Sequence, residues 1–289
     1  MRLVVFQKIA ARALGIRAGN DVYDVAAAGI DAPADVAEIL RGGEKLIADL
    51  RALETRAPAS SRLDLSTLHL LPPTRTAGKI ICLGLNYVSH ATEVGVQKTP
   101  DYPTVFLRAN TSLVGPHEPI IRPRISEALD FEGELVAFVG TSGRHISQRD
   151  ALSHIAGYAV FNDVSIRDYQ LRTTQWTVGK NFDGTGPFGP EFVSADELPP
   201  GAAGLNLQTR LNGEVMQNAS TTNMIFGVAE TVALLSQCFT LEVGDLLVMG
   251  TPSGVGNARE PKLFMKHGDI CEVEIERIGV IRNQIVNEA

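Results

Sequence analysis

The sequence predicts a mixed, β-rich α+β fold, with a large domain preceded by a small N-terminal α+β domain. Short apolar runs punctuated by glycine and proline outnumber helical patterns, which indicates many short strands. Strands and helices do not alternate regularly, so a doubly wound parallel sheet is not expected. A Pro/Ala/Ser-rich stretch and a Pro-Pro pair end the first part of the chain. We therefore divide the chain into residues 1–72 and 73–289.

The composition is that of an ordinary globular protein. The chain has 289 residues, of which 44% are hydrophobic and 20% charged, and carries a net charge of −7. No basic patch stands out, so neither nucleic acid nor an anionic membrane surface is an expected partner. No apolar run approaches the roughly 20 residues of a membrane helix, and the N-terminal run is too short for a signal peptide. A cytoplasmic protein is the expectation.

The three cysteines are expected to be small core residues in a reducing compartment. Cys82, Cys238 and Cys271 are odd in number and widely spaced, which fits neither a disulfide set nor a metal cluster.

Residues 1–72 contain the signals of a small α+β unit. The apolar run 3–6 is a predicted strand, and a Gly19-Asn20 turn between two apolar runs predicts a hairpin. Asp35 is a candidate N-cap, and Glu38 three residues later completes a capping-box pattern. Apolar residues then recur at helical spacing as far as Thr55.

The larger part shows shorter elements. A helix is predicted around residues 228–237. The predicted strands cover residues 80–83, 105–108, 135–140, 159–161, 205–211, 246–249 and 271–275.

Three carboxylates are the strongest signal of a functional site. Successive side chains of an extended chain point to opposite faces, so Glu132 and Glu134 share one face, roughly 6.6 Å apart, at the mouth of an apolar strand. A solvated strand end is one explanation of this pair. A divalent cation is another, because it turns the repulsion between two carboxylates into ligation. Asp163, which follows another mostly apolar run, completes an all-oxygen set of the kind that Mg²⁺ or Mn²⁺ prefers.

Two further positions are candidate catalytic groups. His90 and Glu93 are three residues apart in a segment able to form one helical turn, and a carboxylate beside an imidazole fixes the orientation that a general base needs. A surface ion pair is the alternative. Lys180 stands in an aromatic and glycine-rich loop, where it is either a solvated lysine or a group that neutralises an acidic substrate.

Neither of two glycine-rich stretches fits a nucleotide-binding loop. Residues 250–256 follow a predicted strand but lack the lysine of a phosphate loop. They are either a plain turn or a cradle whose amides and Thr251 hydroxyl hold a small carboxylate. Residues 184–189 fit Gly-x-Gly-x-x-Gly, but Pro187 interrupts the pattern and no strand-to-helix context surrounds it. No Gly-x-Ser-x-Gly elbow supports a serine hydrolase.

Taken together, these motifs resemble the fumarylacetoacetate hydrolase family, in the shorter branch of acylpyruvate hydrolases and related enzymes. The resemblance runs from about residue 79 to the C-terminus, and residues 1–72 are similar to the variable N-terminal domain of many members. The matching segments are Gly84-Leu85-Asn86-Tyr87 with His90 and Glu93, Phe131-Glu132-Gly133-Glu134-Leu135, Asn162 to Asp168, Lys180-Asn181-Phe182, Leu211-Asn212-Gly213-Glu214, Met224-Ile225-Phe226 and Gly250 to Gly256.

The resemblance implies a β-roll catalytic domain, a homodimer, and a site for Mg²⁺ or Mn²⁺. The residues that it assigns are Glu132, Glu134 and Asp163 to the metal, Arg167, Gln170, Lys180 and Thr251 to the substrate, and His90 with Glu93 to a dyad on a lid. Asn86 stands where the eukaryotic tyrosine-degradation enzyme has a fourth, aspartate ligand. This departure places the chain with the three-carboxylate branch.

The resemblance also implies a reaction. A 2,4-dioxo acid (an acylpyruvate such as fumarylpyruvate or acetylpyruvate) would be cleaved by water at its C3–C4 bond, giving pyruvate and a carboxylic acid, as in the breakdown of aromatic compounds. His90 would activate the water, and Lys180 would help to stabilise the enolate. Oxaloacetate decarboxylation and 2-hydroxydienoate isomerisation or hydration use the same enolate chemistry. A non-catalytic, cation-stabilised binding protein is an alternative of another class.

Overall fold

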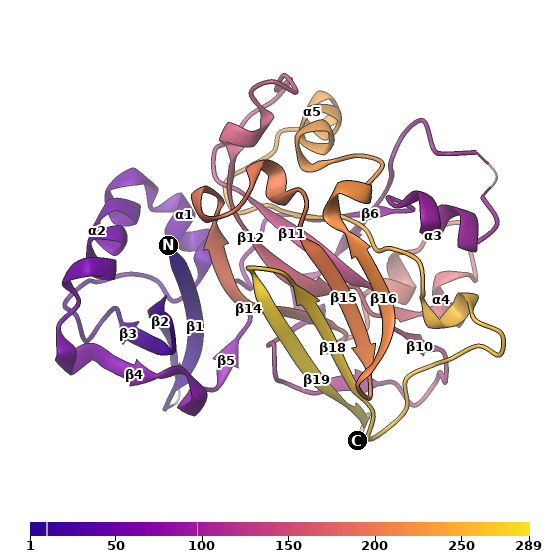
Figure 1. The fold of residues 1–289 in the computed structure, drawn as a ribbon, viewed down its shortest axis with the longest axis horizontal. Coiled ribbons are helices and arrows are strands. Elements are labelled where there is room, and N and C mark those ends of the chain that lie inside the picture. The colour runs from indigo at the N-terminus through magenta and orange to yellow at the C-terminus, as the bar shows by residue number, and fades with distance from the viewer. Residues whose placement is uncertain (10, 97) are drawn as a thin grey trace.

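The computed structural model describes residues 1–9, 11–96 and 98–289. Strands make up 36% of the structure and helices 24%, which confirms the β-rich α+β class. Figure 1 shows the N-terminal elements on one side of the molecule and the larger β-rich part on the other. Within the described residues, no helix is long and apolar enough to cross a membrane.

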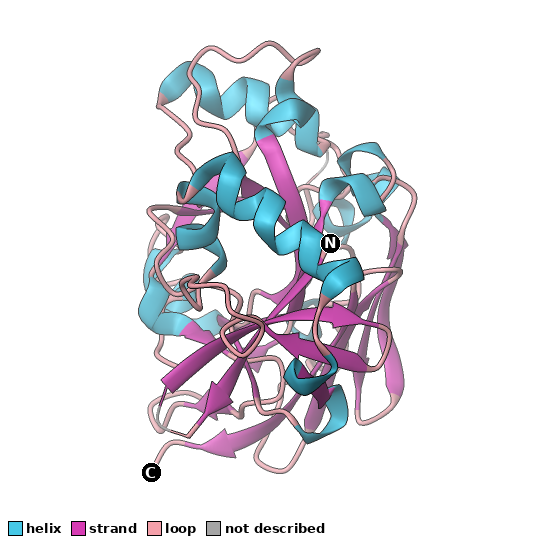
Figure 2. Cartoon of the chain, turned by 90° about the vertical axis from the view of Figure 1, so that its left-hand side faces the viewer, coloured by secondary structure: helices cyan, strands magenta, loops and turns pink. Residues whose placement is uncertain are grey.

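The strand, the hairpin and the helical segment predicted for the N-terminal part are formed. The hairpin of β2 and β3 closes at the Gly19-Asn20 turn, and the Asp35 carboxylate accepts hydrogen bonds from the first amides of α1. Figure 2 looks onto this unit, where the long helix α2 lies across the face nearest the viewer. The elements are β1 (Arg2–Lys8), β2 (Ala11–Ala18), β3 (Asp21–Asp24), α1 (Val36–Arg41), α2 (Gly43–Arg56), β4 (Arg62–Asp64) and β5 (Leu70–Leu71).

One large sheet runs through both parts of the chain. Its order is β4-β3-β2-β1-β14-β12-β11-β17-β6-β7, with β5 on β1 and β8 on β14. The two parts join where β1 pairs antiparallel with β14, Arg2 opposite Val193. The division at residue 72 therefore stays a prediction. The further strands are β6 (Ile80–Gly84), β7 (Thr104–Arg108), β8 (Leu113–Val114), β11 (Gly133–Val139), β12 (Ile155–Asn162), β14 (Gly186–Ser194) and β17 (Leu246–Val248).

A second sheet packs over the first and has the order β16-β15-β18-β19-β9. A short ladder of β10 with β13 lies beside it. These strands are β9 (Ile120–Arg122), β10 (Leu129–Asp130), β13 (Ser165–Ile166), β15 (Asn206–Leu211), β16 (Glu214–Ser220), β18 (Ile270–Ile275) and β19 (Gly279–Asn287). The helices of the larger part are α3 (Val88–Glu93), α4 (Arg167–Gln170) and α5 (Val228–Cys238).

Strand β11 is an inner strand of the large sheet, and both of its faces are covered. Leu135, Ala137 and Val139 point into the core that includes β15, β18 and β19. Val136 and Phe138 point into the core shared with the N-terminal unit. Burial on both faces explains the continuous apolar run that the sequence shows here.

Several features differ from the sequence expectations, and two of them have a clear local cause. Cys82 and Cys271 are buried, but Cys238 is exposed at the C-terminal end of α5, so its predicted place in the core is wrong. The fully buried strand β14 was not predicted, because Pro187 and Pro190 interrupt its apolar pattern.

Candidate metal centre and its cavity

The site is built where β11 and β12 pair antiparallel. Gly133 lies opposite Asn162, so Glu132 and Asp163 both lie just beyond the paired segment. The Glu132 amide donates to Asn162 Oδ1 (2.9 Å), and the Asp163 amide donates to the Glu132 carbonyl oxygen (2.8 Å). These bonds fix the two backbones that carry the carboxylates.

Gly133 explains why the two glutamates share a face. A Cβ at this position would lie 2.3 Å from Thr209 Oγ1 of β15, so a side chain here would force the two sheets apart. Because the Gly133 position faces the second sheet, Glu132 and Glu134 point to the other side of the strand.

The three predicted carboxylates converge. Glu132, Glu134 and Asp163 each offer a carboxylate oxygen within 4.8 Å of the others. Their residues are only 5%, 1% and 0% exposed, so the alternative of a solvated strand end is wrong. An all-oxygen, buried set of this kind suits Mg²⁺ or Mn²⁺.

Cationic side chains neutralise part of this charge. Lys180 Nζ donates to Glu132 Oε2 (2.7 Å) and to Asp163 Oδ2 (2.6 Å), and Lys180 is itself 1% exposed. Arg108 bonds the other oxygen of Asp163, and Arg167 Nη1 lies 2.7 Å from Glu132 Oε1. Lys180 is therefore a buried member of the site and not a solvated loop residue.

The pKa values of the two glutamates move in opposite directions. Burial opposes ionisation of Glu132, but the charges of Lys180 and Arg167 outweigh it and hold the pKa at about 2. Burial and the neighbouring charges of Asp163 and Glu132 raise the pKa of Glu134 well above its ordinary value of 4.5. Glu134 accepts the Gly250 amide but, among the described residues, pairs with no cationic side chain. The site thus retains one carboxylate that a cation would stabilise.

We expect Mg²⁺ or Mn²⁺ binding to release a proton at pH values below the metal-free pKa of Glu134. The raised pKa favours the protonated form of Glu134 in the metal-free protein, whereas ligation requires the carboxylate. Affinity should therefore rise with pH and level off above the metal-free pKa of Glu134. Titration calorimetry in buffers of different ionisation enthalpy measures this release. A binding enthalpy that is the same in all buffers would contradict the expectation.

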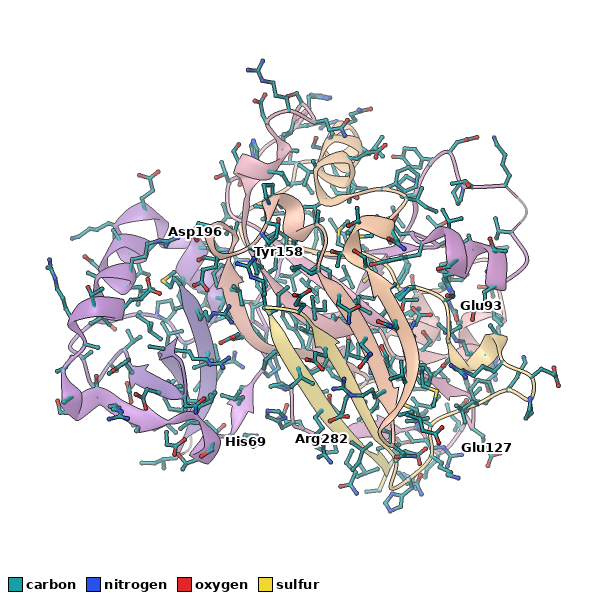
Figure 3. The ribbon with its side chains drawn as sticks, viewed as in Figure 1. His69, Glu93, Glu127, Tyr158, Asp196 and Arg282 are labelled. Atoms are coloured by element: carbon teal, nitrogen blue, oxygen red, sulfur yellow. The ribbon has the colours of Figure 1, made fainter. Side chains whose placement is uncertain are left out.

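The predicted dyad is formed on α3. His90 Nδ1 lies 3.1 Å from Glu93 Oε2, and His90 is 6% exposed on the wall of the cavity. Glu93 Oε1 accepts the Gly254 amide at 2.7 Å, so the carboxylate is held from two sides. Glu93 is the last residue of α3, and Figure 3 shows it on the side of the molecule opposite the N-terminal unit. Within the described residues His90 Nε2 makes no hydrogen bond, so this ring nitrogen is available to exchange a proton with a ligand.

The glycine-rich segment 250–256 connects the parts of the site. Its Gly250, Gly254 and Gly256 amides donate to Glu134, Glu93 and Asp130, respectively. The Thr251 hydroxyl donates to the Gly133 carbonyl oxygen (3.0 Å) and accepts from Gln217 Nε2 (2.8 Å), and Thr251 lines the cavity. The segment is therefore neither a plain turn nor a phosphate loop, because its amides bind carboxylates of the protein.

A cavity of about 290 Å³ lies over these groups. Seven of the nine predicted site residues line it, and the other two, Asp163 and Glu93, contact lining residues. Arg167 donates to Asp130 Oδ2 and Gln170 Oε1 at 2.8 Å, while its Nη2 is buried without a hydrogen bond within the described residues. Arg167 Nη2 is thus available to a ligand carboxylate.

Sequence reasoning missed three residues of the site. Arg108 of β7 holds Asp163, and Asp130 of β10 holds Arg167. Trp176 lines the cavity from the segment between α4 and Lys180. Asp130 stands two residues before Glu132, which was a usable signal, but an arginine at a strand end and a lone tryptophan carry no pattern of their own.

Asn86 has a structural role. Its Nδ2 donates to the Phe226 (3.0 Å) and Met249 (2.7 Å) carbonyl oxygens, and its Oδ1 accepts the Phe226 amide (2.8 Å). Asn86 therefore braces the backbone around the site, and its amide is fully engaged. This geometry agrees with a set of three carboxylates.

Known proteins of the fumarylacetoacetate hydrolase family are similar to this chain in sequence. The model of the fumarylacetoacetate hydrolase C-terminal domain matches residues 79–286. A mitochondrial oxaloacetate tautomerase of Bos taurus is 39% identical over 293 residues, covering 99% of this chain and 92% of that protein.

Solved structures match the whole chain. Fumarylacetoacetate hydrolase from the psychrophilic Exiguobacterium antarcticum is 34% identical, with a TM-score of 0.86 and full coverage of both chains. A 2-hydroxyhepta-2,4-diene-1,7-dioate isomerase from Mycobacterium marinum is 30% identical, with a TM-score of 0.78 and coverage of 100% and 99%. Maleylpyruvate hydrolase from Sphingobium sp. SYK-6, in complex with manganese (II) ion and pyruvate, is 26% identical, with a TM-score of 0.82 and full coverage of both chains. A manganese complex in a similar structure agrees with the divalent cofactor expected from the acidic triad.

Proposed function

The chain belongs to the fumarylacetoacetate hydrolase family, and from this premise we propose that it catalyses the keto–enol tautomerisation of oxaloacetate or a closely related short 2-oxo dicarboxylic acid. The observation that carries the proposal is the His90–Glu93 dyad on the same small cavity as the buried triad. Similarity over 99% of the chain to an oxaloacetate tautomerase supports the choice of substrate.

The side chains divide the work. When bound to Glu132, Glu134 and Asp163, a divalent cation would polarise the 2-oxo group and stabilise negative charge on its oxygen. Arg167, Gln170 and Thr251 line the cavity, and Arg167 Nη2 is available to a substrate carboxylate.

His90 supplies the proton transfer. It takes a proton from C3, and the electron pair of that C–H bond becomes the C2–C3 double bond. The π pair of the C2 carbonyl moves onto its oxygen, which gains a proton from solvent, and the His90 imidazolium returns its proton to solvent. The reverse sequence returns the enol to the keto form. Burial opposes the charge of Lys180, but Asp163 and Glu132 raise its pKa, so its ammonium keeps a positive charge that stabilises the developing oxyanion. Glu93 holds His90 in position throughout.

Hydrolysis of an acylpyruvate is the second candidate, and the same dyad favours it. His90 would then deprotonate a water, which attacks the distal carbonyl and breaks the C3–C4 bond. Decarboxylation needs no general base, because no water has to be deprotonated. A hydratase or isomerase would add a proton to a carbon further along a dienol substrate. The expected homodimer stays a prediction. The cytoplasmic location also stays a prediction, and the similar oxaloacetate tautomerase is a mitochondrial protein.

Parallel assays with Mg²⁺ separate these reactions. We expect the ultraviolet absorbance of enol-oxaloacetate to decay faster with enzyme, without formation of pyruvate. Release of pyruvate from acetylpyruvate or fumarylpyruvate, with no effect on the enol, would replace the proposal by the hydrolase. Release of pyruvate from oxaloacetate would indicate the decarboxylase. Metal-dependent oxalate binding with no turnover of any substrate would indicate a binding protein.

A further inference from the structure

The single tryptophan of the chain is wedged into the cavity wall. A Cβ added to Gly84, at the end of β6, would lie 2.2 Å from Trp176 Cζ3 and 2.9 Å from its Cη2. The indole therefore rests directly on the backbone at Gly84, in a position that only glycine permits. Its ring also packs edge-on against Phe106, with centroids 5.8 Å apart.

This wall is coupled to the reacting end of the cavity. The Phe106 ring lies 5.1 Å from Lys180 Nζ, and Lys180 bonds two of the triad carboxylates. The contacts thus run from the triad to Lys180, from Lys180 to Phe106 and from Phe106 to Trp176. A ligand anchored at the triad would extend along Phe106 and meet the indole of Trp176.

The cavity lining has a polar part and an apolar part. The polar part includes the carboxylates with Lys180, Arg167 and Gln170. The remaining lining is largely apolar, so this part accommodates whatever is attached beyond the 2-oxo group. The apolar lining residues are Leu83, Leu85, Val94, Phe106, Leu171, Trp176 and Val255.

The cavity has room for a short attachment. Its volume is about 290 Å³, which is enough for a four- or five-carbon 2-oxo acid. A longer chain that extends from the triad along Phe106 would meet the Trp176 indole.

We propose that Trp176, seated on Gly84, is the specificity-determining residue that limits this site to short 2-oxo acids. The inference rests on the proposed function only in that the ligand is a 2-oxo acid; it does not depend on which reaction follows. Trp176 is a wall and not a catalytic residue, because its contacts are with Gly84 and Phe106.

Binding of unreactive acids tests the wall directly. In the presence of Mg²⁺, the natural chain should bind 2-oxobutanoate at least about tenfold more tightly than 2-oxooctanoate, since one methylene too many costs a pocket on the order of tenfold or more. Trp176→Ala should reduce that ratio by about tenfold, and Trp176→Phe by less, because a smaller ring remains. Calorimetry measures the affinities, and thermal melting shows that the variants are folded.

Two further variants sharpen the test. Gly84→Ala retains the indole but displaces it, so it should change the same ratio. Val178→Ala alters an exposed residue of the same segment, outside the cavity, and should leave the ratio unchanged. Trp176 is also a built-in reporter, and its fluorescence should change when 2-oxobutanoate binds to the natural chain.

The outcomes separate this inference from the proposed function. An unchanged ratio in folded Trp176→Phe and Trp176→Ala, or no fluorescence change on binding, overturns the wall even if the enzyme turns over oxaloacetate. A changed ratio without any turnover supports the wall and overturns the proposed reaction. If no 2-oxo acid binds, both are wrong.

Discussion

Glu134→Gln should abolish divalent-cation binding while leaving the metal-free protein as stable as the natural chain or more stable. Burial, Asp163 and Glu132 all disfavour the charged form of Glu134, as its raised pKa shows. Glutamine is a neutral isostere whose oxygen can still accept the Gly250 amide. The folded pKa of Glu134 lies above its unfolded value. In the natural metal-free chain, the stability that protonated Glu134 contributes is therefore lost as pH rises through the folded pKa. The variant should lack that loss.

Activity should fall much further than stability. A cation that contributes several kcal/mol to the reaction implies a loss of about a thousandfold or more when it no longer binds. Melting temperatures without metal and Mn²⁺ affinity by calorimetry, both measured at pH 6 and 8, check the two halves of the prediction. Glu127→Gln is the matched control, since Glu127 is exposed and lies away from Glu93 (Figure 3). Full activity in Glu134→Gln would contradict the role of this carboxylate.

His90→Ala should bind metal normally and lose about 10²–10⁴-fold in turnover, the usual contribution of one general acid–base group. His90 bonds Glu93 and none of the triad carboxylates, so its removal leaves the ligands in place. Glu93→Gln should have a smaller effect, because it weakens the orientation of the imidazole without removing the base. Initial rates and Mn²⁺ affinity of the same preparations give the comparison.

An exposed histidine outside the cavity provides the control. His267→Ala should keep the rate of the natural chain. Natural rates in His90→Ala would refute the dyad. Loss of metal binding in that variant would show instead that His90 helps to hold the centre.

The features of the site that depend on spacing within one segment could be predicted from the sequence. Alternation along one strand is enough to place Glu132 and Glu134 on a common face, and a three-residue spacing is enough to pair His90 with Glu93. The position of Asp163 beyond a second apolar strand required pairing in the right register, which the structure shows.

Contacts between distant segments could not be predicted in the same way. Arg108 reaches Asp163 across 55 positions of sequence, and Trp176 reaches Gly84 from another element altogether. Such contacts depend on how β7, β12 and the segment before Lys180 pack, and no single segment encodes that packing. Cys238 shows the same limit, because apolar neighbours in sequence do not determine which face of α5 is buried.

Anomalous diffraction from crystals grown with Mn²⁺ and oxalate tests the central claim most directly. One manganese peak should lie within about 2.0–2.2 Å of a carboxylate oxygen from each of Glu132, Glu134 and Asp163, with oxalate beside it in the cavity. A peak elsewhere, or no peak at the triad at saturating Mn²⁺ while Lys180 still bonds Glu132 and Asp163, would contradict the assignment of this site.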